Sequence, residues 1–248
     1  MRWCGPASLR ELALVGGTYG VYTLTRNTLP SHVARARSNA LDLYHVEQQL
    51  HVDVEHATNG LFAAQVPRLI AVVANYAYSV PHLAVTVAVL AWLYVARPAV
   101  YRRARSVLVT TTLLALVGFW LFPVAPPRFF PNLGFVDTVV RDRTWGSWGN
   151  GTMNEISNQY AAMPSLHVSW SIWVAALVIL CSHHWWVRVL AAGYPLLVTA
   201  VVLGTANHWI LDAVAGVAAV ALAVAICAML SGIRRLWREQ ALPQPAGH

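Results

Sequence analysis

Long apolar runs separated by short polar segments dominate the chain. A helix needs about 20 apolar residues to cross the hydrocarbon core of a bilayer. Six runs approach or reach that length. They predict membrane-spanning helices at residues 11–29, 76–96, 106–122, 165–182, 187–204 and 207–230. The expected fold is therefore all-α, an integral membrane bundle of six transmembrane helices.

Two parts of the chain do not fit a simple series of membrane spans. The apolar stretch 61–97 is too long for one simple span, and we expect Pro67 and Pro81 to divide it into an interfacial lead-in and the span 76–96. Segment 31–58 mixes apolar and polar residues. It is either an amphipathic helix on the membrane surface or a solvated connecting loop with some helix.

Composition supports a membrane protein and argues against a nucleic-acid partner. Hydrophobic residues make up 57% of the 248 residues and charged residues only 11%, whereas soluble domains have about 25% charged residues. All 17 basic residues are arginines, and they cluster at the ends of apolar runs, as in 97–105 and after 233. This pattern is typical of membrane-flanking charge and not of a nucleic-acid surface.

The arginine clusters also predict an orientation. Residues 97–105, the loop before Arg188 and the C-terminal tail are expected on the cytoplasmic side, and six spans place them together. The first run is expected to be a retained span, because no clear small-residue cleavage site follows it. We expect residues 1–60 to hold the first span and an extracytoplasmic amphipathic segment, 61–232 a catalytic membrane core, and 233–248 a cytoplasmic tail.

Three short polar segments adjoin the ends of predicted spans. Residues 123–128 follow the third span, 163–167 begin the fourth and 205–212 begin the sixth. The predicted topology places all three at the same membrane face. We therefore expect them to form one site.

The segment 205–212 contains a histidine and an aspartate with helical spacing. His208 and Asp212 are four residues apart, so they share a helix face. An aspartate inside a membrane span costs roughly 2.5–3.5 kcal/mol on insertion scales and is usually functional. A carboxylate that holds one imidazole nitrogen prepares the other to attack phosphorus. The alternative is a pair that only braces the end of a helix.

The other two segments supply a proton donor and a cation. Pro164 suits the first turn of a helix, Ser165 can cap it, and the backbone N–H groups there can bind an anion. His167, within that turn, can donate a proton to a leaving oxygen. Arg128 offers a planar charged fork for phosphate oxygens. Alternatively, His167 is a hydrated interfacial histidine and Arg128 an interfacial anchor.

Together these segments resemble the motifs of the type 2 phosphatidic acid phosphatase superfamily. That pattern is an Arg-bearing motif, then Pro-Ser-x-His, then His-x-x-x-Asp, here Arg128, Pro164-Ser165-Leu166-His167 and His208-Trp209-Ile210-Leu211-Asp212. Three segments look more like the branch that includes the inositol phosphorylceramide synthases. They are Pro126-Pro127-Arg128, Ala161-Ala162-Met163-Pro164-Ser165-Leu166-His167 and Thr205-Ala206-Asn207-His208.

The resemblance implies a metal-independent membrane enzyme that needs no cofactor. His208 would form a phospho-histidine oriented by Asp212, His167 would protonate the leaving group, and Arg128 would clamp the phosphate together with Ser165. The substrate would be a phospholipid or polyprenyl phosphate, and the reaction either hydrolysis or an inositol-phosphate-type phosphotransfer. The implied location is a bacterial plasma membrane, with the site on the extracytoplasmic face.

The chain departs from the superfamily pattern at three positions. Leu121 and Val202 stand where the motifs usually carry a Lys and an Arg, and Leu166 replaces a Gly. Two phosphate-binding cations are thus missing from their usual places, and Arg68, Arg141 or Arg143 could replace them. A different class of function also stays open, a membrane transporter or receptor that binds a phosphorylated lipid headgroup without chemistry.

Overall fold

The computed structural model describes residues 33–79, 81–144 and 160–240, with part of the stretch 11–24. This part of the chain is helical and contains no strand. Its α-helices are α2 (Val33–Gln49), α3 (Val54–Gln65), α4 (Arg68–Ser79), α5 (Pro81–Ala96), α6 (Pro98–Leu121), α7 (Thr138–Arg141), α9 (Leu166–Cys181), α10 (Trp185–Gly204) and α11 (Ile210–Gln240). Two short 3-10 helices, η1 (Pro127–Phe129) and η2 (Pro131–Leu133), follow α6.

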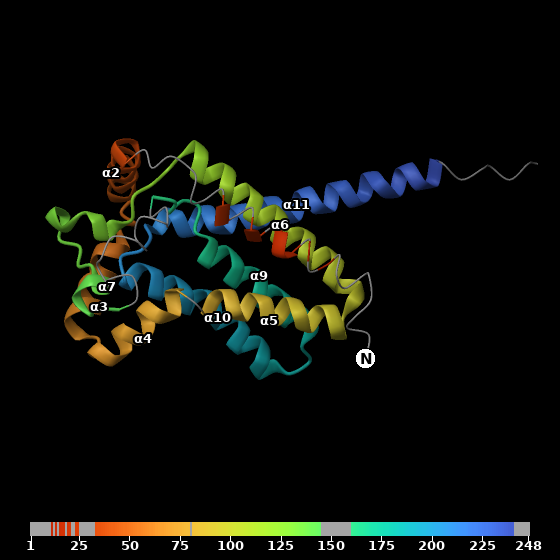
Figure 1. Ribbon diagram of the computed structural model, residues 1–248, viewed down its shortest axis with the longest axis horizontal. Helices are drawn as coiled ribbons and strands as arrows, with labels where there is room; N and C mark the ends of the chain where they lie inside the picture. The colour runs from red at the N-terminus through yellow and green to blue at the C-terminus, as the bar shows by residue number, and fades with distance from the viewer. Residues whose placement is uncertain are drawn as a thin grey trace, which may run out of the picture.

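Helix α9 is the centre of the bundle. It packs against α5, α6, α10 and α11, and most of its side chains are buried. Two tryptophans tie it to α6, because Trp173 Nε1 donates to the carbonyl of Ala104 at 2.9 Å and Trp170 Nε1 donates to Thr112 Oγ1 at 3.3 Å. The short helices α2, α3, α4 and α7 gather at one end of the molecule (Figure 1).

The described helices include three that are long and apolar enough to cross a membrane: α6, α10 and residues 210–233 of α11. Helices α4 and α5 reach that length only together, and they are bent by 52° at their junction. Helix α9 is apolar but has only 16 residues. The all-α prediction is confirmed, whereas the structure gives three or four candidate spans in its described part rather than six. The first predicted span, 11–29, lies largely outside the described residues.

Prolines and arginines explain where the boundaries differ from the prediction. The stretch 61–97 breaks at Pro67 and at Pro81, so the span expected at 76–96 is α5, which begins five residues later. Helix α6 begins at Pro98 rather than near 106, because a proline suits the first helical turn and arginine side chains can extend away from an apolar surface. The spans expected at 165–182 and 187–204 match α9 and α10 within two residues.

Helix α2, which precedes the membrane core, packs against other parts of the chain. Helix α2 buries Ala36, Ala40 and Leu43 against the segment that follows α6. Asn39 Nδ2 donates to the carbonyl of Pro123 at 2.8 Å, and the backbone N–H of Ala125 donates to the carbonyl of Ala36 at 3.0 Å. Of the two interpretations of segment 31–58, the structure agrees with the helical one, with its apolar face covered by the chain itself.

Helices α9 and α11 meet at very close range at Gly216. A Cβ atom at this position would lie 2.7 Å from the carbonyl oxygen of Ser165 and 3.1 Å from Ser169 Oγ. Ser169 Oγ also donates to the carbonyl of Gly216 at 3.1 Å. The start of α9 and the first turns of α11 can approach this closely only because position 216 has no side chain.

We predict that Gly216→Ala separates the two helices and lowers the unfolding temperature of the detergent-solubilised protein. Overpacking of this kind typically costs about 1–3 kcal/mol. Gly232→Ala is the matched control in the same helix, since no described atom lies within 4 Å of its Cβ position. Equal unfolding temperatures for the two variants would contradict the close contact.

Candidate active site

Hydrogen bonds to backbone carbonyls bring the three polar segments together. The N–H of Val124 donates to the carbonyl of Tyr160 at 2.9 Å, which joins the first segment to the lead-in of the second. Trp209 Nε1 donates to the carbonyl of Ala125 at 2.8 Å, which joins the first to the third. The N–H of Ser165 donates to the carbonyl of Asp212 at 2.9 Å, which joins the second to the third. Each segment is therefore bound to both of the others.

His208 and Asp212 form a buried pair at the start of α11. His208 Nδ1 lies 3.1 Å from Asp212 Oδ2, and the same oxygen accepts the backbone N–H of Trp209 at 3.0 Å. Asp212 is fully buried and His208 is 3% exposed. Because a carboxylate only accepts, Nδ1 of the neutral ring carries the proton and Nε2 keeps its lone pair. Within the described part of the chain, Nε2 has no hydrogen-bond partner.

His167 faces this pair from the first turn of α9. Its ring centre lies 5.6 Å from that of His208, with the rings tilted by 58°. His167 Nε2 lies 3.1 Å from the backbone carbonyl of Tyr78, whose ring stacks on the imidazole at 4.1 Å. The ring of His82 also approaches His167 to 4.1 Å. The junction of α4 and α5 therefore holds the second histidine, a contact that the sequence motifs do not indicate.

Arg128 is held by the residue that precedes His208. Its Nη1 donates to Asn207 Oδ1, and its backbone N–H donates to the carbonyl of Ala206 at 3.0 Å. Asn207 Nδ2 in turn donates to Thr205 Oγ1 at 2.7 Å, which fixes the amide. The guanidinium also lies 5.3 Å from the ring centre of Phe129. The arginine is thus oriented by the same segment that carries the histidine–aspartate pair.

Ser165 serves the structure of this site. It is the N-cap of α9, with its Oγ accepting from the N–H of Val168 at 3.5 Å, and it is fully buried. Its backbone N–H is bound to Asp212 and its carbonyl accepts from Ser169 Oγ at 2.8 Å. A direct contact between Ser165 and a phosphate stays a prediction.

Two arginines of α2 bind backbone carbonyls on either side of the first polar segment. Arg35 Nη2 donates to the carbonyl of Leu121, at 2.9 Å, and Arg37 Nη1 donates to the carbonyl of Phe129, at 3.2 Å. Arg141, by contrast, is bound to the carboxylate of Asp142 and to the carbonyl of Ala63. The sequence did not indicate that α2 lies beside the first motif, because nothing in its local pattern identifies the segment it packs on.

Two buried carboxyl groups, Glu47 of α2 and Glu55 of α3, lie behind the start of α11. Glu47 Oε1 accepts the backbone N–H of Leu211 at 2.9 Å, and both glutamates are fully buried. Burial raises the pKa of Glu47 to about 9, and it also raises the pKa of Glu55. A backbone N–H lowers the pKa of Glu47, but the effect of burial is larger. These groups were not singled out by the motifs.

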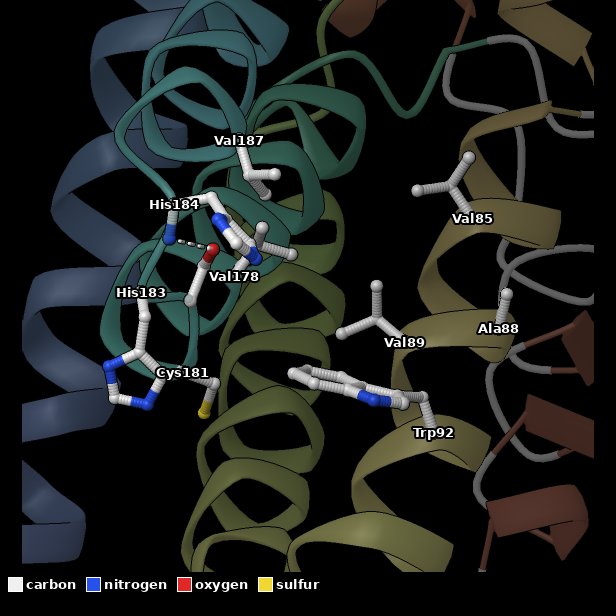
Figure 2. A pocket seen from close by; sticks show the side chains of 10 residues that line it. Val85, Ala88, Val89, Trp92, Val178, Cys181, His183, His184 and Val187 are labelled. Atoms are coloured by element: carbon white, nitrogen blue, oxygen red, sulfur yellow. Dashed lines mark hydrogen bonds between the residues drawn. The ribbon is translucent and has the colours of Figure 1, made fainter.

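A cavity of about 560 Å³ lies between α5, α9 and α10, at the opposite end of α9 from His167 (Figure 2). Its lining is mainly apolar, with Trp92 and Cys181 among the side chains that surround it. It therefore lies away from His167 and His208, and the histidines that line it are His183 and His184. In the described part of the chain, no three His, Cys, Asp or Glu side chains gather as a metal site.

Comparison with known families gives one match. The family model described as the PAP2 superfamily, the type 2 phosphatidic acid phosphatases, matches residues 41–226. This range includes all three polar segments and most of the described helices. No curated protein and no solved structure matches the chain.

We predict that the indole bond of Trp209 is needed to hold the site together. Trp209→Phe leaves the buried carbonyl of Ala125 without its donor, at a cost of about 1–3 kcal/mol. Trp173→Phe is the matched control, because its indole makes a similar bond to Ala104 elsewhere in the bundle. Both variants should unfold at lower temperature, but only Trp209→Phe should weaken binding of orthovanadate measured by calorimetry. Equal vanadate binding in the two variants would contradict this role.

Proposed function

The chain belongs to the PAP2 superfamily, and from this premise we propose that it is a membrane-embedded enzyme that transfers the phosphoryl group of a lipid phosphate through a phospho-histidine on His208. Superfamily membership by itself suggests a phosphatase-type activity on a lipid phosphate. The covalent route, the residue roles and the choice of acceptor are the further content of the proposal.

The orientation of His208 carries the proposal. Its Nδ1 is bound to Asp212, which leaves Nε2 as the nitrogen that can attack phosphorus. The positive charge that develops on the ring during attack is stabilised by the buried carboxylate beside it. Among the described residues, Nε2 of His208 has no hydrogen-bond partner. A histidine that only stabilised the end of a helix would have no use for a nitrogen kept in this state.

His167 is proposed as the general acid and base. The carbonyl of Tyr78 can only accept, so His167 Nε2 carries a proton, and Nδ1 is the nitrogen that would exchange a proton with the substrate. The stacked ring of Tyr78 limits rotation of the imidazole. At 5.6 Å between ring centres, the two histidines are close enough to act on one phosphoryl group.

Two half-reactions follow. Nε2 of His208 attacks phosphorus, the bond from phosphorus to the lipid oxygen breaks, and His167, which begins the step protonated on both nitrogens, gives the proton on Nδ1 to that oxygen. An acceptor hydroxyl then loses its proton to His167 and attacks phosphorus, and the phosphorus–nitrogen bond breaks. Water as acceptor releases phosphate, and a bound alcohol yields a new phosphate ester. Because the motifs resemble those of the inositol phosphorylceramide synthase branch, we propose transfer to an alcohol as well as hydrolysis.

The proposed setting is a bacterial plasma membrane with six spans and the site on the extracytoplasmic face. The arginine-rich start of α6 and the arginines in the last turns of α11 support a cytoplasmic location for the opposite end. The site lies at the end of α6, the start of α9 and the beginning of α11, close to α2, α3 and α7 at one end of the bundle. At such a position the histidines would lie near the membrane surface, where lipid headgroups are found.

The test offers purified protein a panel of lipid phosphates with and without alcohol acceptors, and follows both phosphate release and new lipid products. We predict that His208→Ala lowers turnover by about 10⁴-fold or more, because loss of a catalytic nucleophile usually has an effect of this size. His45→Ala, an exposed histidine on α2, is the control.

Three outcomes separate the possibilities. Phosphate release supports hydrolysis, and a new lipid product supports transfer. The absence of both with every substrate would count against the enzyme and favour a headgroup-binding transporter or receptor. A His208→Ala variant that turns over normally would instead show that His208 is not the nucleophile.

A second prediction concerns Arg128. Its replacement by Ala should lower kcat by about 10²- to 10³-fold, as expected for the loss of one group that stabilises transition-state charge. Arg128→Lys should recover only part of the rate, because lysine lacks the planar fork that bonds Asn207 and phosphate together. Arg103→Ala, exposed near the other end of α6, removes the same charge without touching the site. Unchanged kinetics in Arg128→Ala would show that this arginine is only an interfacial anchor.

A further inference from the structure

The mechanism above does not use the most deeply buried acidic pair outside the site, Glu47 and Glu55. The two residues lie on different helices, α2 and α3, and both are fully buried. Each of the two carboxyl groups acts on the pKa of the other, as neighbouring acids do. In a membrane protein with so few charges, two acids placed together behind α11 call for an explanation.

One contact links the pair to the site. Glu47 Oε1 accepts the backbone N–H of Leu211, the second residue of α11. The first N–H groups of a helix have no partner within the helix and need an acceptor from elsewhere. Leu211 lies directly before Asp212, so Glu47 holds the turn of chain that carries the carboxylate of the histidine–aspartate pair.

The remaining oxygens of the pair point to a shared proton. None of the described residues makes a well-formed hydrogen bond to Glu47 Oε2 or to either oxygen of Glu55. Two bare carboxylates at such range in the interior would repel each other strongly, whereas one proton between them turns the repulsion into a hydrogen bond. The direction of both pKa shifts agrees with a retained proton.

The other titratable groups around the pair strengthen this conclusion. They are Tyr44 on α2, Asp53 between α2 and α3, and Asp212 on α11. None of the three brings a positive charge. A second negative charge on the pair would therefore also be repelled by Asp53 and Asp212.

We propose that Glu47 and Glu55 share one proton and act as positioning residues, which fix the first turn of α11 and so keep Asp212 aimed at His208. The effect on turnover rests on the proposed function; the shared proton does not. The acid pair is thus a support for the nucleophile that comes from the two helices before the membrane core.

The test compares three variants of the full-length protein. Glu47→Gln keeps an oxygen for the N–H of Leu211 and donates an N–H to Glu55, so it should retain kcat near neutral pH. Glu47→Ala removes the contact and should lower kcat on the order of 10- to 100-fold with little change in KM, because small misplacements of catalytic groups have effects of this size. Asp42→Asn, exposed on the same helix, is the charge-matched control and should change neither.

The pH dependence of unfolding gives a second readout that needs no substrate. The folded chain keeps the proton of Glu47 up to about pH 9, whereas the unfolded chain releases it near the usual value of 4.5. The contribution of this group to stability is therefore full below pH 4.5 and is lost as the pH rises to about 9. In Glu47→Gln, which has no proton to release, the unfolding temperature should fall less steeply over this interval than in the wild type.

Failure of the positioning role, of the shared proton and of the proposed function would each give a different result. If the wild type is active and Glu47→Ala keeps its kcat, the positioning role is wrong while the proposed function stands. If Glu47→Gln loses stability with pH as steeply as the wild type, the shared proton is wrong whatever the enzyme acts on. If no lipid phosphate is turned over, the proposed function fails, and so does the predicted effect of Glu47→Ala on turnover. The pH dependence of unfolding still tests whether Glu47 and Glu55 share a proton.

Discussion

The carboxylate of Asp212 is the interaction on which the rest of the site depends. One carboxylate oxygen of Asp212 binds both the imidazole of His208 and the backbone N–H of Trp209. The backbone carbonyl of Asp212 accepts the N–H of Ser165. A single residue therefore orients His208, shapes the turn before α11 and joins α11 to the start of α9. Because it is fully buried, its charge must be compensated by these donors, so the geometry around it is narrowly constrained.

The need to satisfy polar groups in an apolar bundle explains why the site extends beyond its three motifs. Helices α2 and α3 bring Glu47 and Glu55 to the first turn of α11, and α2 also binds the segment after α6. The junction of α4 and α5 supplies a backbone carbonyl and a stacked ring for His167. Elements that look like connections in the sequence thus hold His167 and the start of α11 in place.

The sequence predicted what depends on local pattern and composition. The apolar runs located α9 and α10 within two residues, and the motifs singled out residues that the fold brings together. The start of α6 was wrong because its arginines, such as Arg102, belong to the helix although they resemble a flanking loop. The bonds from Trp209 to Ala125 and from His167 to Tyr78 end on backbone carbonyls, which leave no signature in the sequence. Glu47 did leave one, since it continues the buried face of Ala36, Ala40 and Leu43 along α2, but a single acid at such a position does not reveal its partner.

The central claim is that phosphoryl transfer passes through His208. Rapid-quench labelling of the wild-type protein with a radiolabelled lipid phosphate, followed by peptide mapping, tests it most directly. The claim predicts an acid-labile phosphoryl group that appears during turnover on the peptide containing His208. Turnover with no phosphorylated protein, or with the label on another residue, would contradict it.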